Sequence, residues 1–234
     1  MSRWLAGAGL SLVEALRDVD QPVAVDGRAV TFWKELPEHC EGSAAEVAET
    51  LRRLHRLSPP ADLGLPPLAP FVRLGERIDT AVTLAEVDRS WLREHLNTLR
   101  QQYEQLPPGL PRAAVHGDAW GGNIVHTAAG PVLLDLERFA FGPPEWDLAS
   151  IAVDHFTFGS LSAPDWATAC ERYGYDVTTW SGYETLRDIR ELRKVTFAAQ
   201  MALKYPRVQQ QALFRVACIR GEHGPRPWHW QAVP

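Results

Sequence analysis

The chain has 234 residues, of which 45% are hydrophobic and 23% are charged, which suits a globular protein with one substantial core or two small ones. Its net charge is -5 and it has no run of basic residues longer than Arg52-Arg53, so we expect no binding to nucleic acid. No stretch approaches the roughly 20 apolar residues of a membrane-spanning helix, so we expect no membrane association. Its three cysteines are odd in number and far apart, which predicts a reducing, cytoplasmic location.

The first 37 residues are expected to form a small β unit. Residues 3–8 are typical of the end of a helix, because Gly9 stands where a C-terminal cap is expected. Two apolar runs, 23–25 and 29–33, flank Asp26-Gly27, the strongest short signal for a β-hairpin. We therefore predict a hairpin that leads into a connector at residues 33–36.

The remainder is predicted to be mainly helical. Ser43 and Glu46 have the spacing of a capping box and start a helix that ends before Pro59-Pro60. After a proline-rich connector, the apolar spacing predicts helices over residues 84–106, 145–156, 164–173, 183–203 and 208–219. Two short strands, 124–126 and 131–135, flank a turn between the first two of these helices.

This order predicts an α+β fold, since strands and helices do not alternate as in a parallel sheet. We expect a partial β lobe over residues 1–37, a mainly helical lobe with an embedded hairpin over 38–220, and an irregular tail over 221–234.

Three side chains with oxygen atoms lie around the embedded hairpin. Asp118 and Asn123 stand in a glycine-rich loop before its first strand, and Asp135 ends its second strand. Phosphoryl transfer needs such a set, because a carboxylate orients the attacking hydroxyl while hard oxygen ligands hold Mg²⁺ against the nucleotide phosphates. The alternative is a turn with Asx hydrogen bonds at Asp118 and Asn123, and a strand-end cap at Asp135.

The order of these residues resembles that of the aminoglycoside phosphotransferase and choline kinase superfamily, whose members are relatives of protein kinases. The resemblance lies in His116-Gly117-Asp118, in Asn123 five positions later and in Asp135 on the next strand. It implies a protein-kinase-like fold, with Mg²⁺ as cofactor and ATP or GTP as phosphate donor. It also implies that Asp118 is the catalytic base, that Asn123 and Asp135 bind the metal, and that Asp135 corresponds to the Asp of the protein-kinase Asp-Phe-Gly motif.

A second family signature follows the hairpin. Residues 142–149 match Gly-Asp-Pro-x-x-Asp-Leu-Ala, except that Pro143 stands in place of the first Asp. The resemblance implies that Asp147 is a structural carboxylate that braces the catalytic loop through hydrogen bonds. We expect His116 to be a hydrogen-bonding strut rather than a base or ligand. Glu137 would share a strand face with Asp135, where it could contact metal or water or simply face solvent.

The family's first lobe has parts for which this sequence has no room. That lobe supplies a glycine-rich strand pair over the phosphates, a strand lysine that contacts them and a helix glutamate that pairs with the lysine. Here only a candidate hinge is expected to contact the nucleotide, and it consists of Trp33, Lys34, Glu35 and Leu36. Lys34 does not stand where the strand lysine is expected. Either the sequence begins late or the natural protein lacks half of this lobe.

Two classes of function are consistent with these features. The first is a kinase that moves the terminal phosphate of ATP or GTP to a hydroxyl of an aminoglycoside, an amino alcohol or a sugar. The second is a catalytically impaired remnant that binds a ligand or partner through its helical lobe. The intact Asp118, Asn123 and Asp135 favour the first, since a remnant has no chemical need of them.

Two further interactions are expected, with an acceptor and with a second chain. Acidic residues of the helical lobe would suit a cationic acceptor, although ordinary surface charge explains them equally well; they are Glu145, Asp154, Asp165 and Glu171. The N-terminal hairpin, without its usual sheet neighbours, is expected either to pack on the helical lobe or to pair with the same element of a second chain as a homodimer.

Overall fold

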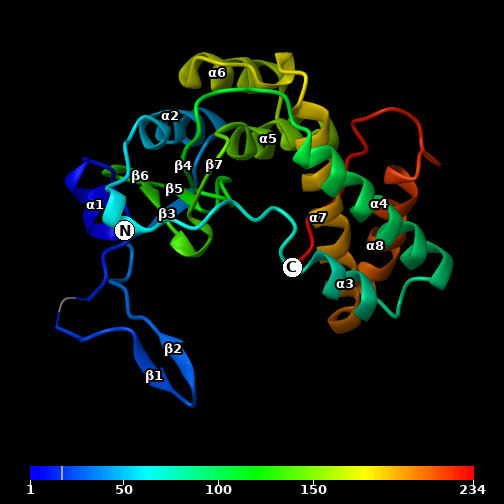
Figure 1. Ribbon diagram of the computed structural model, residues 1–234, viewed down its shortest axis with the longest axis horizontal. Helices are drawn as coiled ribbons and strands as arrows, with labels where there is room; N and C mark the ends of the chain where they lie inside the picture. The colour runs from blue at the N-terminus through cyan, green and yellow to red at the C-terminus, as the bar shows by residue number, and fades with distance from the viewer. Residues whose placement is uncertain (17) are drawn as a thin grey trace.

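The computed structural model describes residues 1–16 and 18–234, and it shows a small β part beside a larger helical part (Figure 1). The predicted α+β class is confirmed. The helices are α1 (Ser2–Gly7), α2 (Ala44–His55), α3 (Leu74–Thr80), α4 (Glu86–Glu104), α5 (Glu145–Val153), α6 (Ala163–Tyr173), α7 (Tyr183–Lys204) and α8 (Gln209–Ile219). The strands are β1 (Val23–Val25), β2 (Arg28–Val30), β3 (His39–Glu41), β4 (Ala113–Val115), β5 (Ile124–Thr127), β6 (Gly130–Leu133) and β7 (Ala140–Gly142).

Strands β1 and β2 form the predicted N-terminal hairpin. Val23 pairs with Val30 in an antiparallel register. The turn residues Asp26 and Gly27 have φ angles of 49° and 75°. Positive φ at both central residues matches the natural twist of the two strands and closes the two-residue turn. The hairpin projects away from the other strands and from the helical part (Figure 1).

A three-stranded antiparallel sheet in the order β3-β5-β6 carries the embedded hairpin, and β4 pairs separately with β7. Strand β3 was not predicted. The chain before β1 also joins this sheet, because Val13 N–H donates to the Leu133 carbonyl at 3.0 Å and Leu133 N–H donates to the Ser11 carbonyl at 3.0 Å. Residues near the N-terminus therefore pack on the strand that leads to Asp135.

The prediction that Glu137 shares a strand face with Asp135 is wrong. Strand β6 ends at Leu133, Asp135 has a φ angle of 44°, and Leu136–Arg138 forms a short 3-10 helix. The chain therefore leaves the extended conformation before Asp135 is reached, and the alternation of strand side chains no longer applies.

The helical part follows the predicted order with two additions. Ser43 and Glu46 form the predicted capping box at the start of α2. Helix α3 was not predicted, and α5 continues beyond Val153 as a π-helix over Asp154–Phe158. Residues 221–234 contain neither helix nor strand, and they pack on the core, since Trp230 is buried. Their separation as a tail stays a prediction.

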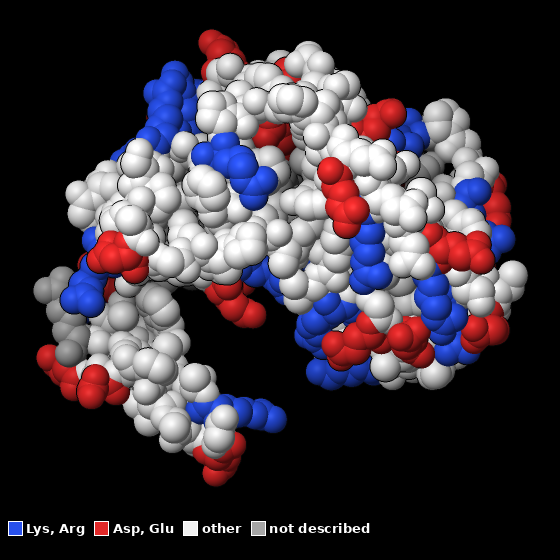
Figure 2. All heavy atoms as spheres, viewed as in Figure 1, with Lys and Arg blue, Asp and Glu red and all other residues white. Residues whose placement is uncertain are grey.

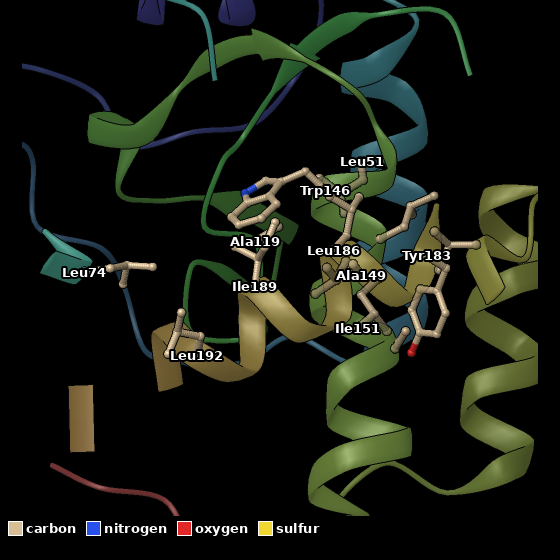
Figure 3. Packing of buried hydrophobic residues seen from close by; sticks show 14 of the residues in the cluster. Leu51, Leu74, Ala119, Trp146, Ala149, Ile151, Tyr183, Leu186, Ile189 and Leu192 are labelled. Atoms are coloured by element: carbon tan, nitrogen blue, oxygen red, sulfur yellow. The ribbon is translucent and has the colours of Figure 1, made fainter. Parts of the chain in front are cut away.

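One apolar cluster joins both ends of the chain to the helical part. Trp146 from α5 packs with Ala119 and with Ile189 from α7 (Figure 3). Leu5 and Leu10, from the first ten residues, are buried in the same cluster. The division at residue 37 therefore stays a prediction, because α1 shares its core with the helical part. None of the helices in the described part of the chain is long and apolar enough to cross a membrane.

The shared core makes a prediction about α1. Leu5→Ala should lower the free energy of unfolding by about 2–5 kcal/mol, because it removes a fully buried side chain and leaves a cavity. Urea unfolding followed by tryptophan fluorescence would measure the change. Val25→Ala in the exposed part of the hairpin is the control, and it should change the free energy by less than about 0.5 kcal/mol. Equal, small effects of both substitutions would show that α1 does not contribute to the core.

Candidate active site

The candidate catalytic loop lies between β4 and β5, and its first turn requires a glycine. Gly117 has a φ angle of 85°, and a Cβ at this position would lie 2.3 Å from the carbonyl oxygen of Arg138. Any other residue would be strained by its backbone angle and would collide with the chain after Asp135. The loop therefore approaches the 3-10 helix closely.

Asp147, in the first turn of α5, fixes this loop through hydrogen bonds to its backbone. Its carboxylate accepts hydrogen bonds from the backbone N–H groups of His116 at 2.7 Å and Gly117 at 2.9 Å. Nε2 of His55, from α2, lies 3.1 Å from the same carboxylate. Burial acts to raise the pKa of Asp147, but the His55 hydrogen bond and the nearby charges outweigh it, and the pKa is lowered.

His116 connects the loop with the strand end that precedes Asp135. Its ring is buried, and its Nε2 lies 3.0 Å from the carbonyl oxygen of Leu134. The N–H of Leu134 in turn donates to the backbone carbonyl of Asn123 at 2.8 Å. Leu134 is thus bonded on both sides, and Asp135 follows it directly. These bonds bring the segments of Asp118, Asn123 and Asp135 together.

The Asn123 side chain is oriented by the loop itself. Its Nδ2 donates to the backbone carbonyl of Asp118 at 2.9 Å, which leaves the amide oxygen as the atom available for a ligand. Asp135 has a left-handed backbone, and its Oδ1 accepts only a long bond of 3.4 Å from Glu137 N–H. A strained residue that keeps a carboxylate accessible is typical of functional positions.

The donor set fits Mg²⁺ held partly by a nucleotide. Across residues 1–16 and 18–234, no group of three or more His, Cys, Asp and Glu side chains is arranged to hold a metal ion. Mg²⁺ usually takes one or two protein carboxylates and completes its shell with phosphate oxygens and water. One carboxylate, Asp135, with the Asn123 amide oxygen therefore suits a metal that arrives with nucleotide phosphates.

Arg190, which the sequence did not suggest, lies behind Asp118. The Asp118 side chain is 38% exposed, and Arg190 Nη1 lies 3.8 Å from its Oδ1. Arg190 itself is buried, lies 4.0 Å over the Trp146 ring and donates to the Trp146 carbonyl at 2.7 Å. Its other Nη lies 3.9 Å from Asp147. The sequence offered one indication that Arg190 is buried: it follows Ile189 directly within the apolar stripe of α7.

The candidate hinge lies apart from these residues. Lys34 pairs with Glu14, through its Nζ at 2.6 Å and its backbone N–H at 2.8 Å. Trp33 is 40% exposed and forms an antiparallel bridge with Ala15. Within the described part of the chain, none of Trp33, Lys34, Glu35 and Leu36 bonds to Asp118, Asn123 or Asp135. Nucleotide contact at the hinge stays a prediction.

Two of the acidic residues suggested for a cationic acceptor serve the fold instead. Glu145 is fully buried and its carboxylate accepts the N–H of Leu110. Asp154 is largely enclosed in the π-helix, and burial raises its pKa to about 6. Neither offers an accessible negative charge to a ligand.

The bracing role predicted for Asp147 can be tested by stability. Asp147→Ala should lower the free energy of unfolding by about 3 kcal/mol or more, because it leaves buried N–H donors without an acceptor. Since the folded-state pKa is lowered, this difference should be full above the ordinary value of 3.8 and should vanish as the pH falls through the folded value. Denaturant unfolding at several pH values would measure it. Asp165→Ala, at the exposed start of α6, is the control. If both variants lost an equally small part of the free energy of unfolding, the bracing role of Asp147 would be contradicted.

Comparison with known proteins supports a shared fold. A choline/ethanolamine kinase family protein from Mesorhizobium loti is 18% identical with a TM-score of 0.63, over 94% of this chain and 76% of that one. Choline kinase LicA from Streptococcus pneumoniae is 15% identical with a TM-score of 0.62, over 95% and 79%. A spectinomycin phosphotransferase in complex with ADP and spectinomycin is 14% identical with a TM-score of 0.60, over 97% and 78%.

Sequence comparison gives a local match and a broad one. A probable ketoamine kinase of Lactiplantibacillus plantarum is 38% identical over 88 residues, which span 33% of this chain and only 30% of that protein. The model of the phosphotransferase enzyme family matches residues 1–189, which include the candidate catalytic loop, Asp135 and Asp147. The resemblance to aminoglycoside phosphotransferases and choline kinases, and with it the kinase-like fold, is thus confirmed. The chain belongs to the phosphotransferase enzyme family.

Proposed function

We propose that this chain carries the active site of a kinase that transfers the terminal phosphate of ATP or GTP to a hydroxyl group of a small molecule. The observation that supports it most is the bonding of Leu134 to both His116 and Asn123, which places Asp135 beside the catalytic loop. Two carboxylates and an amide oxygen then serve one site. A remnant that only binds a partner has no use for this arrangement.

Each side chain has a separate task in this proposal. Asp118, whose side chain is partly exposed, orients the acceptor hydroxyl and takes its proton. Asn123 and Asp135 hold Mg²⁺ against the phosphates, and the ion neutralises the charge that develops during transfer. Asp147 and His116 keep the loop rigid. The hinge residues Trp33, Lys34, Glu35 and Leu36 hold the nucleotide on the side of the β1–β2 hairpin.

The names of the relatives support a small-molecule acceptor. The related structures include choline and spectinomycin kinases, and the ketoamine kinase match adds an amine-linked keto compound. The nucleotide in the spectinomycin complex supports a nucleotide donor here. Cys40, Cys170 and Cys218 are free thiols, which supports a reducing cytoplasm as the location.

The roles of the two carboxylates can be separated by substitution. Asp118→Asn should lower kcat by about 10²–10⁴-fold and leave nucleotide affinity nearly unchanged, because the base acts on the acceptor. Asp135→Ala should instead weaken the binding of Mg²⁺-ATP. Calorimetric titration and a coupled ADP-release assay with a panel of hydroxyl acceptors would measure both.

The exposed Asp62→Asn is the matched control and should behave as the unchanged protein. Equal losses of nucleotide affinity in the Asp118 and Asp135 variants would contradict separate roles. Nucleotide binding without ADP release for any acceptor would favour the remnant.

The isolated hairpin leads to a prediction about self-association. Val25 and Phe32 are 48% and 42% exposed, and among the described residues, 1–16 and 18–234, strand β1 pairs with no strand besides β2. Because such edges readily pair with a second chain, we expect a symmetric dimer through β1–β2. Val25→Lys should raise the dissociation constant at least tenfold in sedimentation equilibrium. Val82→Lys, in an exposed loop, is the control, and a stable monomer at all concentrations would contradict the dimer.

A further inference from the structure

A cavity of about 260 Å³ opens beside the candidate catalytic loop. Gly117, the neighbour of Asp118, lines it, and so do residues 137–140 that follow Asp135. The rest of the lining comes from the connector at residues 66–69 and 72–73, from α5 and from α7. The size suits a small molecule or a part of one. The cavity therefore lies where a compound could reach Asp118.

Three arginines line this cavity against one carboxylate. They are Arg73, Arg138 and Arg193, and the carboxylate is that of Glu137. Arg73 forms a long pair of 3.5 Å with the exposed Glu76. Arg193 donates to the Pro70 carbonyl oxygen at 3.0 Å.

Neither Arg138 nor Arg193 has a carboxylate within ion-pair distance anywhere in residues 1–16 and 18–234, although exposed arginines elsewhere, such as Arg93, do have one. The surface over α3, at the edge of the hollow beside the hairpin, also carries basic side chains, interspersed with acidic ones (Figure 2).

The positive charges oppose one another. Burial lowers the pKa of Arg193 to about 9, and repulsion by Arg190 and Arg138 contributes, while the attraction of Asp118 opposes the shift. The pKa of Arg77, on α3, is lowered first by burial and then by Arg73 and Arg138. Like charges in a partly buried space cost stability, and such clusters of perturbed groups occur preferentially at functional sites. The attraction of Asp118 opposes the lowering of the pKa at both Arg77 and Arg193, and an anion in the cavity would add a second counter-charge.

We infer that this cavity binds an acidic group of the acceptor, a carboxylate or a phosphate, through Arg138 and Arg193. The guanidinium fork matches both groups, because it can donate two parallel hydrogen bonds to a pair of oxygens. The acceptor is therefore a small hydroxyl compound that carries a negative charge. This inference rests on the proposed kinase function, since it assigns the cavity to the acceptor of that reaction.

The lining residues favour the acceptor over the nucleotide as the source of the anion. None of the hinge residues Trp33, Lys34, Glu35 and Leu36 lines the cavity, and its lining contains no residue before Pro66. The nucleotide in our proposal lies between the hinge and the metal ligands. The cavity instead lies between Gly117, the neighbour of Asp118, and Arg193 of α7. Of the acidic residues suggested for a cationic acceptor, Glu145 is buried, Asp154 is largely enclosed and none lines this cavity, whereas the arginines border it. We therefore favour an anionic acceptor over a cationic one.

The anion site can be tested first with inorganic phosphate. With Mg²⁺ and saturating ADP present, phosphate should raise the thermal midpoint of the full chain relative to chloride at equal ionic strength. Arg138→Gln and Arg193→Gln should lose most of this shift. Arg172→Gln, an exposed arginine of α6, is the matched control and should keep it. An equal shift in the unchanged protein and in both cavity variants would overturn the site.

The acceptor assignment is tested with matched pairs, gluconate against sorbitol and glucose 6-phosphate against glucose. In phosphate transfer from ATP, an acidic member should have a kcat/KM at least about tenfold higher than its neutral partner, and Arg138→Gln should remove this preference without changing ATP affinity. Glu137→Gln should strengthen binding of the acidic member, because it removes the one carboxylate of the lining.

The outcomes separate this inference from the proposed function. Transfer to neutral acceptors without any preference for acids would overturn the anion site and leave the kinase standing. Loss of ATP affinity in Arg138→Gln, with acceptor affinity unchanged, would also overturn it, because the arginines would then serve the nucleotide. A third outcome is that calorimetry shows binding of the acidic compounds that depends on Arg138, while no acceptor is phosphorylated. That result would support the anion site and contradict the kinase function.

Discussion

The rest of the site depends on one buried carboxylate. Asp147 accepts the backbone N–H groups of His116 and Gly117, so the turn before Asp118 is fixed to the start of α5. A buried charge is costly unless several donors satisfy it, and here backbone donors and His55 do so. Nε1 of Trp146, the preceding residue, donates to the Gly117 carbonyl at 2.8 Å. One helical turn thus holds both the N–H and the carbonyl of Gly117.

The same turn couples the site to the core. Trp146 packs with apolar residues of α7 and carries Arg190 on its ring, and Arg190 faces both Asp118 and Asp147. One buried cation therefore balances two carboxylates, of which one is enclosed and one is partly open to solvent. Burial lowers the pKa of Arg190, and the attraction of these carboxylates opposes that shift. A shift of α7 would therefore change the distance between Arg190 and Asp118, and with it the electrostatic environment of Asp118, even if the loop itself did not move.

Local signals in the sequence were sufficient where local geometry decides the structure. The Asp26-Gly27 turn and the capping box of α2 were predicted because each joins residues only three positions apart, Val25 with Arg28 and Ser43 with Glu46. Strand β3 was missed, since three exposed residues carry no apolar pattern and pair only with the distant β5. Arg190 and His55 were missed for the same reason, because their partners lie 44 and 92 positions away. The family pattern placed Asp118, Asn123 and Asp135 on one hairpin, whereas the arginines of the cavity come from segments that only the tertiary fold brings together.

The strained residue after β6, Asp135, affects both the proposed metal site and the cavity beside it. Asp135 adopts a left-handed backbone without being glycine, which costs about 1–2 kcal/mol. The conformation is held because Leu134 is bonded to His116 and Asn123 on one side and Leu136 is buried on the other. This sharp change of direction leaves the Asp135 carboxylate exposed and turns the following residues into the 3-10 helix. That helix presents Arg138 to the cavity, so the residue proposed to hold a cation also determines where the wall of the proposed anion site begins.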